Sequence, residues 1–137
     1  MAVVEQLIRK ENDGTLSFGN YELTSKSKVS DFEYEGDIYK IKTYKEITKL
    51  EKNGMFVYES VPGTTVTGMK NKEDGMSFTV EGIEDAQVTL ELEPEKEYDV
   101  RISGKDSGVM KTNLGGKLNI GIELNAGEPV SVQVTAK

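Results

Sequence analysis

The chain has 137 residues, with 24 acidic and 17 basic side chains and a formal net charge of -7. A chain of this length can bury an apolar core without covalent cross-links, as one domain or as two small units that share a core. It contains no Cys, His or Trp, which excludes disulfides, Cys/His zinc sites and catalytic triads built on histidine. Because an acidic chain without a basic stretch repels phosphate backbones, we expect no nucleic-acid partner.

The first residues do not resemble a secretion signal. Glu5 is acidic, no positive charge precedes the first apolar run, and that run is short. No window approaches the roughly 20 apolar residues that span a bilayer. We therefore expect a cytoplasmic protein that is not inserted in a membrane, with signal-independent release or association with a virion as the alternative.

Short runs of alternating apolar and polar residues fill most of the chain and are separated by turn residues. Alternation repeated in this way is typical of an antiparallel sandwich or barrel with one face exposed to solvent. The pattern predicts strands, in chain order, at residues 16–24, 37–42, 55–59, 77–80, 87–92, 98–102, 117–122 and 130–134.

One short helix, at residues 44–52, is the predicted exception to the strands. Residues 43–46 have the Ser/Thr-x-x-Glu capping pattern, Ile47 and Leu50 follow three apart, and Asn53-Gly54 lies where a helix would end. The alternative is a hairpin that turns at Asn53-Gly54. In that hairpin Ile47 and Leu50 would face opposite sides of the strand.

A weak internal repeat predicts three hairpins. Segments that begin at residues 8, 69 and 110 each have a glycine as their seventh residue, followed by a strand. A strand, a glycine turn and a second strand form a hairpin. Convergence on a common turn is the simpler explanation of the repeat.

The most specific motif is the stretch Leu92-Glu-Pro94-Glu-Lys-Glu-Tyr98-Asp-Val100. It resembles the tyrosine corner of fibronectin type III and immunoglobulin-like sandwiches, whose Leu-x-Pro-x-x-x-Tyr-x-Val pattern it matches at all four positions. The resemblance implies a loop that crosses between two sheets and a tyrosine hydroxyl that bonds to upstream backbone. Its implication is structural, and it names no ligand.

A second resemblance covers most of the chain. Residues 49–63 and 110–118 are similar to segments of small uncharacterised proteins of anaerobic Firmicutes, some of which carry the label endosialidase. Sialidase-type sites hold the sugar carboxylate with three arginines, because the planar guanidinium matches a carboxylate in a bidentate fashion. This chain has only Arg9 and Arg101. The resemblance therefore implies a bacterial, phage-related or cell-surface context rather than an activity.

An acidic row is the one candidate metal site. On a continuous strand, alternate carboxylates would face one side and could bind Ca²⁺ through their oxygens. The alternative is a solvated strand whose charges discourage edge pairing. The row consists of Asp31, Glu33, Glu35 and Asp37.

Tyrosines of the first half are the candidate binding residues. Exposed tyrosine rings stack on sugars or anchor protein interfaces, whereas half-buried ones are ordinary sheet residues. The candidates are Tyr34, Tyr39, Tyr44 and Tyr58. No carboxylate pair is singled out as the acid and base of a glycosidase.

Together these patterns predict an all-β protein, an antiparallel β-sandwich with one short helix and an immunoglobulin- or fibronectin-III-like C-terminal half. Residues 1–70 are expected to form an N-terminal β-rich subdomain and residues 71–137 the C-terminal sandwich half. The predicted function is non-enzymatic and needs no cofactor: an interaction protein that forms a homo-oligomer or docks on another protein. The alternative is a small carbohydrate-binding module, with Ca²⁺ as an aid to glycan binding.

Overall fold

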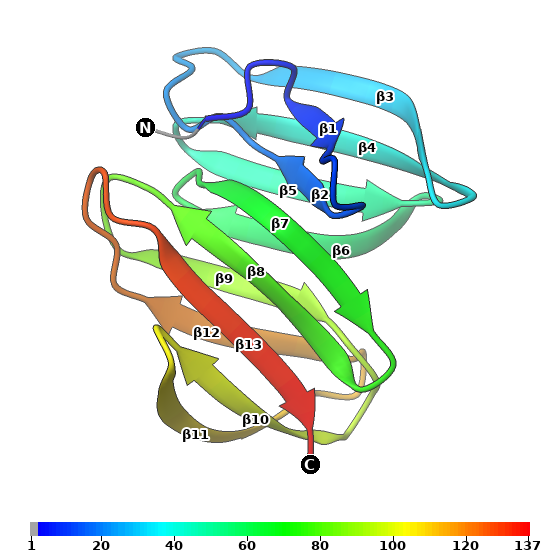
Figure 1. Cartoon of the computed structure of the whole chain (residues 1–137), viewed down its shortest axis with the longest axis vertical. Helices are drawn as coiled ribbons and strands as arrows, with labels where there is room; N and C mark the ends of the chain where they lie inside the picture. The colour runs from blue at the N-terminus through cyan, green and yellow to red at the C-terminus, as the bar shows by residue number, and fades with distance from the viewer. Residues whose placement is uncertain (1–2) are drawn as a thin grey trace.

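The fold is a β-sandwich of two antiparallel sheets, as the sequence predicts. The computed structural model describes residues 3–137, and within them every regular element is a strand (Figure 1). The first sheet has the order β1-β2-β7-β8-β13-β10-β11, and the second has the order β12-β9-β6-β5-β4-β3. No helix in residues 3–137 is long and apolar enough to cross a membrane.

The strands of each sheet come from both halves of the chain, and the expected boundary at residue 70 falls within β7. The seven-stranded sheet consists of β1 (Ile8–Lys10), β2 (Leu16–Phe18), β7 (Thr65–Lys72), β8 (Gly75–Glu81), β13 (Val130–Ala136), β10 (Glu97–Ile102) and β11 (Lys105–Lys111). The six-stranded sheet consists of β12 (Lys117–Ile122), β9 (Ala86–Glu91), β6 (Met55–Val61), β5 (Ile47–Lys52), β4 (Asp37–Tyr44) and β3 (Ser27–Tyr34).

The helix predicted at residues 44–52 is wrong, and the alternative hairpin forms instead. Strand β5 pairs with β6 around a turn in which Asn53 and Gly54 both have positive φ, 52° and 79°. Such a turn matches the twist of a two-residue hairpin and favours Asn-Gly. Ile47 lies half-buried on the outer face while Leu50 is buried between the sheets. The two apolar residues therefore lie on opposite faces of β5.

Strand β2 is shorter than predicted, because the chain leaves the sheet after Phe18. Gly19 has a φ of +96°, and a Cβ at this position would lie 2.4 Å from the carbonyl oxygen of Thr64. Only glycine therefore allows the N-terminal segment to pass so close to the connection between β6 and β7.

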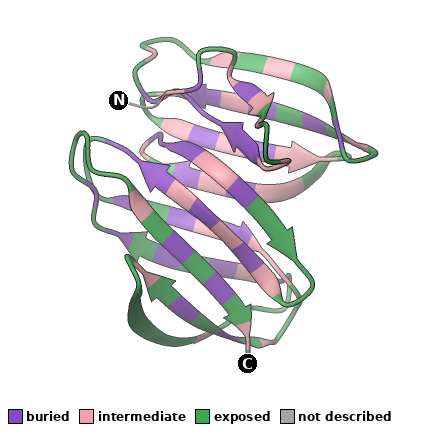
Figure 2. Cartoon of the chain, in the orientation of Figure 1, coloured by how far each residue is buried: buried purple, intermediate pink, exposed green. Residues whose placement is uncertain are grey.

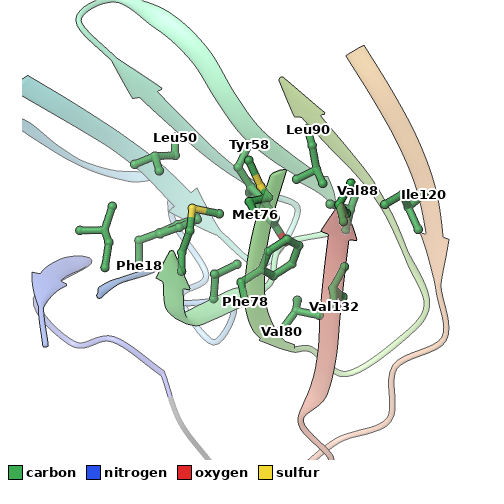
Figure 3. Packing of buried hydrophobic residues seen from close by; sticks show 14 of the residues in the cluster. Phe18, Leu50, Tyr58, Met76, Phe78, Val80, Val88, Leu90, Ile120 and Val132 are labelled. Carbon is green, nitrogen blue, oxygen red and sulfur yellow. The ribbon is translucent and has the colours of Figure 1, made fainter. Parts of the chain in front are cut away.

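The core is one apolar layer between the sheets, and buried residues alternate with more exposed ones along many of the strands (Figure 2). Tyr58 lies at its centre and is fully buried (Figure 3). Its ring packs edge-to-face on Phe18 and Phe78, with centroids 5.2 and 5.8 Å away. The aromatic cluster therefore joins β2 and β8 of one sheet to β6 of the other.

A buried hydroxyl network holds the connection from β6 to β7. Thr64 Oγ1 lies 2.8 Å from the Tyr58 hydroxyl and 2.7 Å from Ser60 Oγ. Thr48 Oγ1 donates to the Thr64 carbonyl and accepts from its N–H. No buried side-chain polar atom lacks a partner in the part of the chain that the structure describes. Polar groups can thus lie in this core because each has a hydrogen bond.

Two crossings between the sheets lie side by side. Loop 92–96 leads from β9 to β10, and loop 112–116 leads from β11 back to β12. The Leu92 N–H donates to the Gly116 carbonyl at 2.8 Å, and the Thr112 hydroxyl donates to the Glu93 carbonyl. Strands β9 to β12 therefore form one long hairpin that bends from the six-stranded sheet into the seven-stranded sheet.

The predicted hydrogen bond of Tyr98 is present at this bend: its hydroxyl accepts from the Glu93 N–H at 3.2 Å. The repeat, in contrast, predicts only two of its three hairpins correctly. Strands β1 and β2 pair, as do β7 and β8, but β11 and β12 lie in different sheets. Gly116 serves the bend there, because a Cβ would lie 2.4 Å from the Leu92 carbonyl oxygen.

We predict that Tyr58→Phe lowers the free energy of unfolding by about 1 kcal/mol, because it deletes the hydroxyl bonded to Thr64 and keeps the ring. Urea unfolding followed by circular dichroism measures the change. Tyr44→Phe, on the outer face, is the matched control and should change stability by less than about 0.5 kcal/mol. Equal losses in both variants would contradict a role for the buried network.

Candidate functional site

Of the four candidate tyrosines, three are buried. Tyr58 lies in the core, and Tyr34 packs edge-to-face on Tyr39 with ring centroids 5.6 Å apart. The Tyr34 hydroxyl donates to the Gly14 carbonyl at 2.6 Å. Only Tyr44 among them has a partly exposed ring, on the outer face of β4, where the Lys26 ammonium lies 5.8 Å from its centroid. The four tyrosines therefore do not form one surface for stacking.

Burial raises the pKa of three of these tyrosines, Tyr34, Tyr39 and Tyr58. It raises the pKa of both Tyr39 and Tyr58 to about 12, because desolvation penalises the phenolate. Both hydroxyls stay protonated at neutral pH and act as structural groups.

The four carboxylates of the predicted acidic row do not share a face. Asp31 lies in a bulge of β3 with a φ of +58°, and Glu35 lies in the turn before β4. Glu33 pairs with Ile38, which faces outward, whereas Asp37 pairs with the buried Tyr34. A bulge and a turn thus interrupt the alternation on which the prediction depends.

Asp37 is held by other partners. It accepts a hydrogen bond from Asn53 Nδ2 at 2.9 Å and lies 3.6 Å from Lys52 Nζ. Among the described residues, no group of three or more acidic side chains could hold a metal ion.

A cluster of lysines on the outer face of the six-stranded sheet is the most distinctive charged feature. Lys28 of β3, Lys42 of β4 and Lys49 of β5 lie directly opposite one another in register. Lys40, two residues before Lys42, points to the same side of the sheet. We call these four side chains the lysine face. They line a shallow depression of about 220 Å³ together with Glu51.

The electrostatics of the lysine face are unfavourable without a counter-ion. Like charges opposite one another on neighbouring strands destabilise a sheet. Two carboxylates offset part of this repulsion: Glu51 lies opposite Lys40, with its Oε2 3.9 Å from Lys49 Nζ, and Glu59 of β6 lies opposite Lys49. Partial burial and the neighbouring ammonium groups lower the pKa of Lys42.

The lysine face was not predicted from the sequence. The signal was the alternation Lys40-x-Lys42 followed by Lys49 after a short turn, which places three ammonium groups on one side of a hairpin. Lys28 was not predictable in this way, because the bulge in β3 sets its partner.

The free edges of the sheets are the second candidate interaction site. Strands β1, β11, β12 and β3 are the edge strands. β1 has three residues, β3 is bulged, and β11 is bulged opposite Val100 of β10 and has a lysine at each end. These features hinder pairing with another chain. β12 differs, because its six residues stay in continuous register with β9.

Main-chain groups of β12 point outward at alternate residues. The Gly116 carbonyl accepts from Leu92 on the β9 side, whereas the Lys117 carbonyl accepts from Asn113 on the opposite side. Because successive residues of a strand alternate in this respect, the N–H and C=O groups of Asn119 and Gly121 point away from β9. Both residues are exposed.

Comparison of the chain with known proteins found no similar protein. No protein-family model, no curated protein sequence and no solved structure matches the chain.

We predict that Ca²⁺ and EDTA leave the melting temperature unchanged, because the acidic row is divided between a bulge, a turn and two faces of the sheet. Differential scanning calorimetry with each additive measures this. A Ca²⁺-dependent rise that disappears in Asp31→Asn would restore the acidic row as a metal site.

A second prediction concerns alkaline pH. Unfolded tyrosine ionises near pH 10, and the folded pKa of Tyr39 and Tyr58 is about 12. Their contribution to stability is therefore complete below pH 10 and is lost as the pH rises from 10 to about 12. Tyr39→Phe and Tyr58→Phe should each move the alkaline unfolding midpoint to higher pH, as followed by circular dichroism. Tyr44→Phe should move it less, because the pKa of this partly exposed tyrosine is raised chiefly by a hydrogen bond with Glu46 rather than by burial, and a uniform response of all three variants would contradict the assignment.

Proposed function

We propose that this chain is a non-enzymatic assembly protein, a β-sandwich that pairs with a second copy of itself through the free edge of β12. The observation that carries the proposal is the regular geometry of that edge. Among the edge strands of residues 3–137, β12 alone keeps six residues in continuous register with its neighbour.

Self-pairing of β12 has a favourable register. In an antiparallel pair centred on Ile120, Asn119 of one copy lies opposite Gly121 of the other, and these residues have outward-pointing main-chain groups. The same register places Lys117, whose ammonium also bonds Glu91 within the chain, opposite Glu123, so charges of opposite sign face each other. A two-fold pair of this kind is closed and self-complementary, which is the commonest form of small oligomer.

The character of the described surface favours an interaction protein over an enzyme. The depressions are shallow, and one of about 340 Å³ is lined by Asp99, Arg101, Asp106 and Thr135. Hydrogen bonds from Ser17 and Thr15 lower the pKa of the Glu11 and Asp13 carboxyls, respectively. A general acid would need a raised pKa.

Asn119→Pro tests the proposal. Because the Asn119 N–H points away from β9, proline removes no internal ladder bond, while its ring blocks the outer edge. We expect the wild type to elute as a dimer and Asn119→Pro as a folded monomer in size-exclusion chromatography with light scattering.

Asn119→Ala is the matched control. It also loses the side-chain hydrogen bond from Thr89, at 2.6 Å, but keeps the main-chain N–H. It should remain a dimer, and circular dichroism should show the same strand content in all three proteins. A wild type that is monomeric at every concentration would refute pairing through β12.

A further inference from the structure

The lysine face is a candidate binding site that does not depend on the proposed pairing at β12. β3, β4 and β5 lie at the opposite end of the six-stranded sheet from β12. Pairing at β12 would therefore leave the lysine face open. The chain is acidic overall, yet four of its lysines line one depression on this face.

From this placement we infer that the lysine face is a binding site for a multiply charged oxyanion, a phosphate or sulfate group. The depression has ammonium groups on three neighbouring strands. An anion bound between them would replace the repulsion between lysines on neighbouring strands with attraction to the anion.

The number of charges that face the depression indicates a ligand with more than one negative charge. Lys28, Lys40, Lys42 and Lys49 contribute four positive charges and Glu51 one negative charge. Glu59 of β6, opposite Lys49, adds a second negative charge beside the depression. Two positive charges remain, so a singly charged anion would leave one of them uncompensated.

The kind of residue defines the chemistry further. The lysine face contains no arginine, so the planar fork that binds carboxylates in a bidentate fashion is absent from it. Lysine is a compact point charge with rotatable donors, and it binds phosphate and sulfate oxygens without a fixed orientation. The lowered pKa of Lys42, from partial burial and then from neighbouring lysines, is consistent with a site that gains from an added anion.

The oxyanion could come from two sources, a free anion or the same groups on a sugar chain. Titration with inorganic pyrophosphate and with a sulfated hexasaccharide separates them, each followed by calorimetry at low ionic strength and against NaCl of equal ionic strength. Equal affinity for the two indicates a free anion, whereas tighter binding of the hexasaccharide indicates groups displayed on a glycan. Failure of both to bind better than matched NaCl would overturn the inference.

Three variants locate the binding. Lys42→Gln should weaken it about fivefold, because one close charge is lost. Lys70→Gln is the matched control, since Lys70 is exposed on β7 of the other sheet, and it should leave the affinity unchanged.

Glu51→Gln removes the only carboxylate that lines the depression and should strengthen binding about threefold. Partial unfolding of a variant would weaken binding, so stronger binding by Glu51→Gln could not be explained by a loss of folding. Equal effects of Lys42→Gln and Lys70→Gln would indicate attraction to net charge alone and overturn the site. The oligomeric state of each variant, from light scattering, separates this outcome from any failure of pairing at β12.

Discussion

The hydrogen bonds around Thr64 are the interaction on which the rest of the sandwich depends. The chain leaves the six-stranded sheet after β6 and enters the seven-stranded sheet at β7, and Thr64 lies fully buried between them. A buried connection of this kind exposes main-chain groups to an apolar core, which is costly unless each has a partner. Thr48 supplies both partners of the Thr64 backbone, and Tyr58 and Ser60 bond its side chain.

The same network holds the irregular N-terminal segment against the sandwich. The Thr43 hydroxyl lies 2.8 Å from that of Thr48 and accepts from the Asn20 N–H, and Thr65 donates to the Gly19 carbonyl. One polar cluster thus joins β4, β5, the β6 to β7 connection and the segment after β2. Because a network whose groups are all bonded rigidifies its surroundings, it explains how the thirteen short strands of residues 3–137 keep one arrangement without a disulfide.

The sequence predicts the sandwich well because alternation of apolar and polar residues reports directly which strand faces are buried. The helix predicted at residues 44–52 is wrong because Ile47 and Leu50 lie on opposite faces of a strand and not on one face of a helix. Local capping patterns are weak where tertiary pairing decides: the Thr43 hydroxyl that would cap a helix is instead buried against Thr48. Pairing of β5 with β4 and with β6 overrides such a local preference.

The β3 bulge explains why the candidate site was harder to predict than the fold. Tyr34 pairs with Asp37 and Phe32 with Tyr39, but beyond the bulge Val29 pairs with Ile41 and Lys28 with Lys42. One extra residue shifts the register and reverses which side each earlier residue faces. It breaks the acidic row at Asp31 and also places Lys28 beside Lys42. Neither effect is written in the alternation of the sequence.

The distribution of irregularities along the sheets has a consistent physical logic. Both β3 and β11 contain a bulge, and β11 also has a lysine at each end. These features hinder unspecific pairing at an open edge. The bend between β9 and β10 makes the segment from β11 to β12 the outer strand of both sheets on one side of the sandwich. Of that continuous outer strand, only the β12 portion keeps regular geometry. In the proposed assembly, a regular edge beside edges that are blocked would restrict association to a single register, and the charged sheet face at the far end would stay accessible.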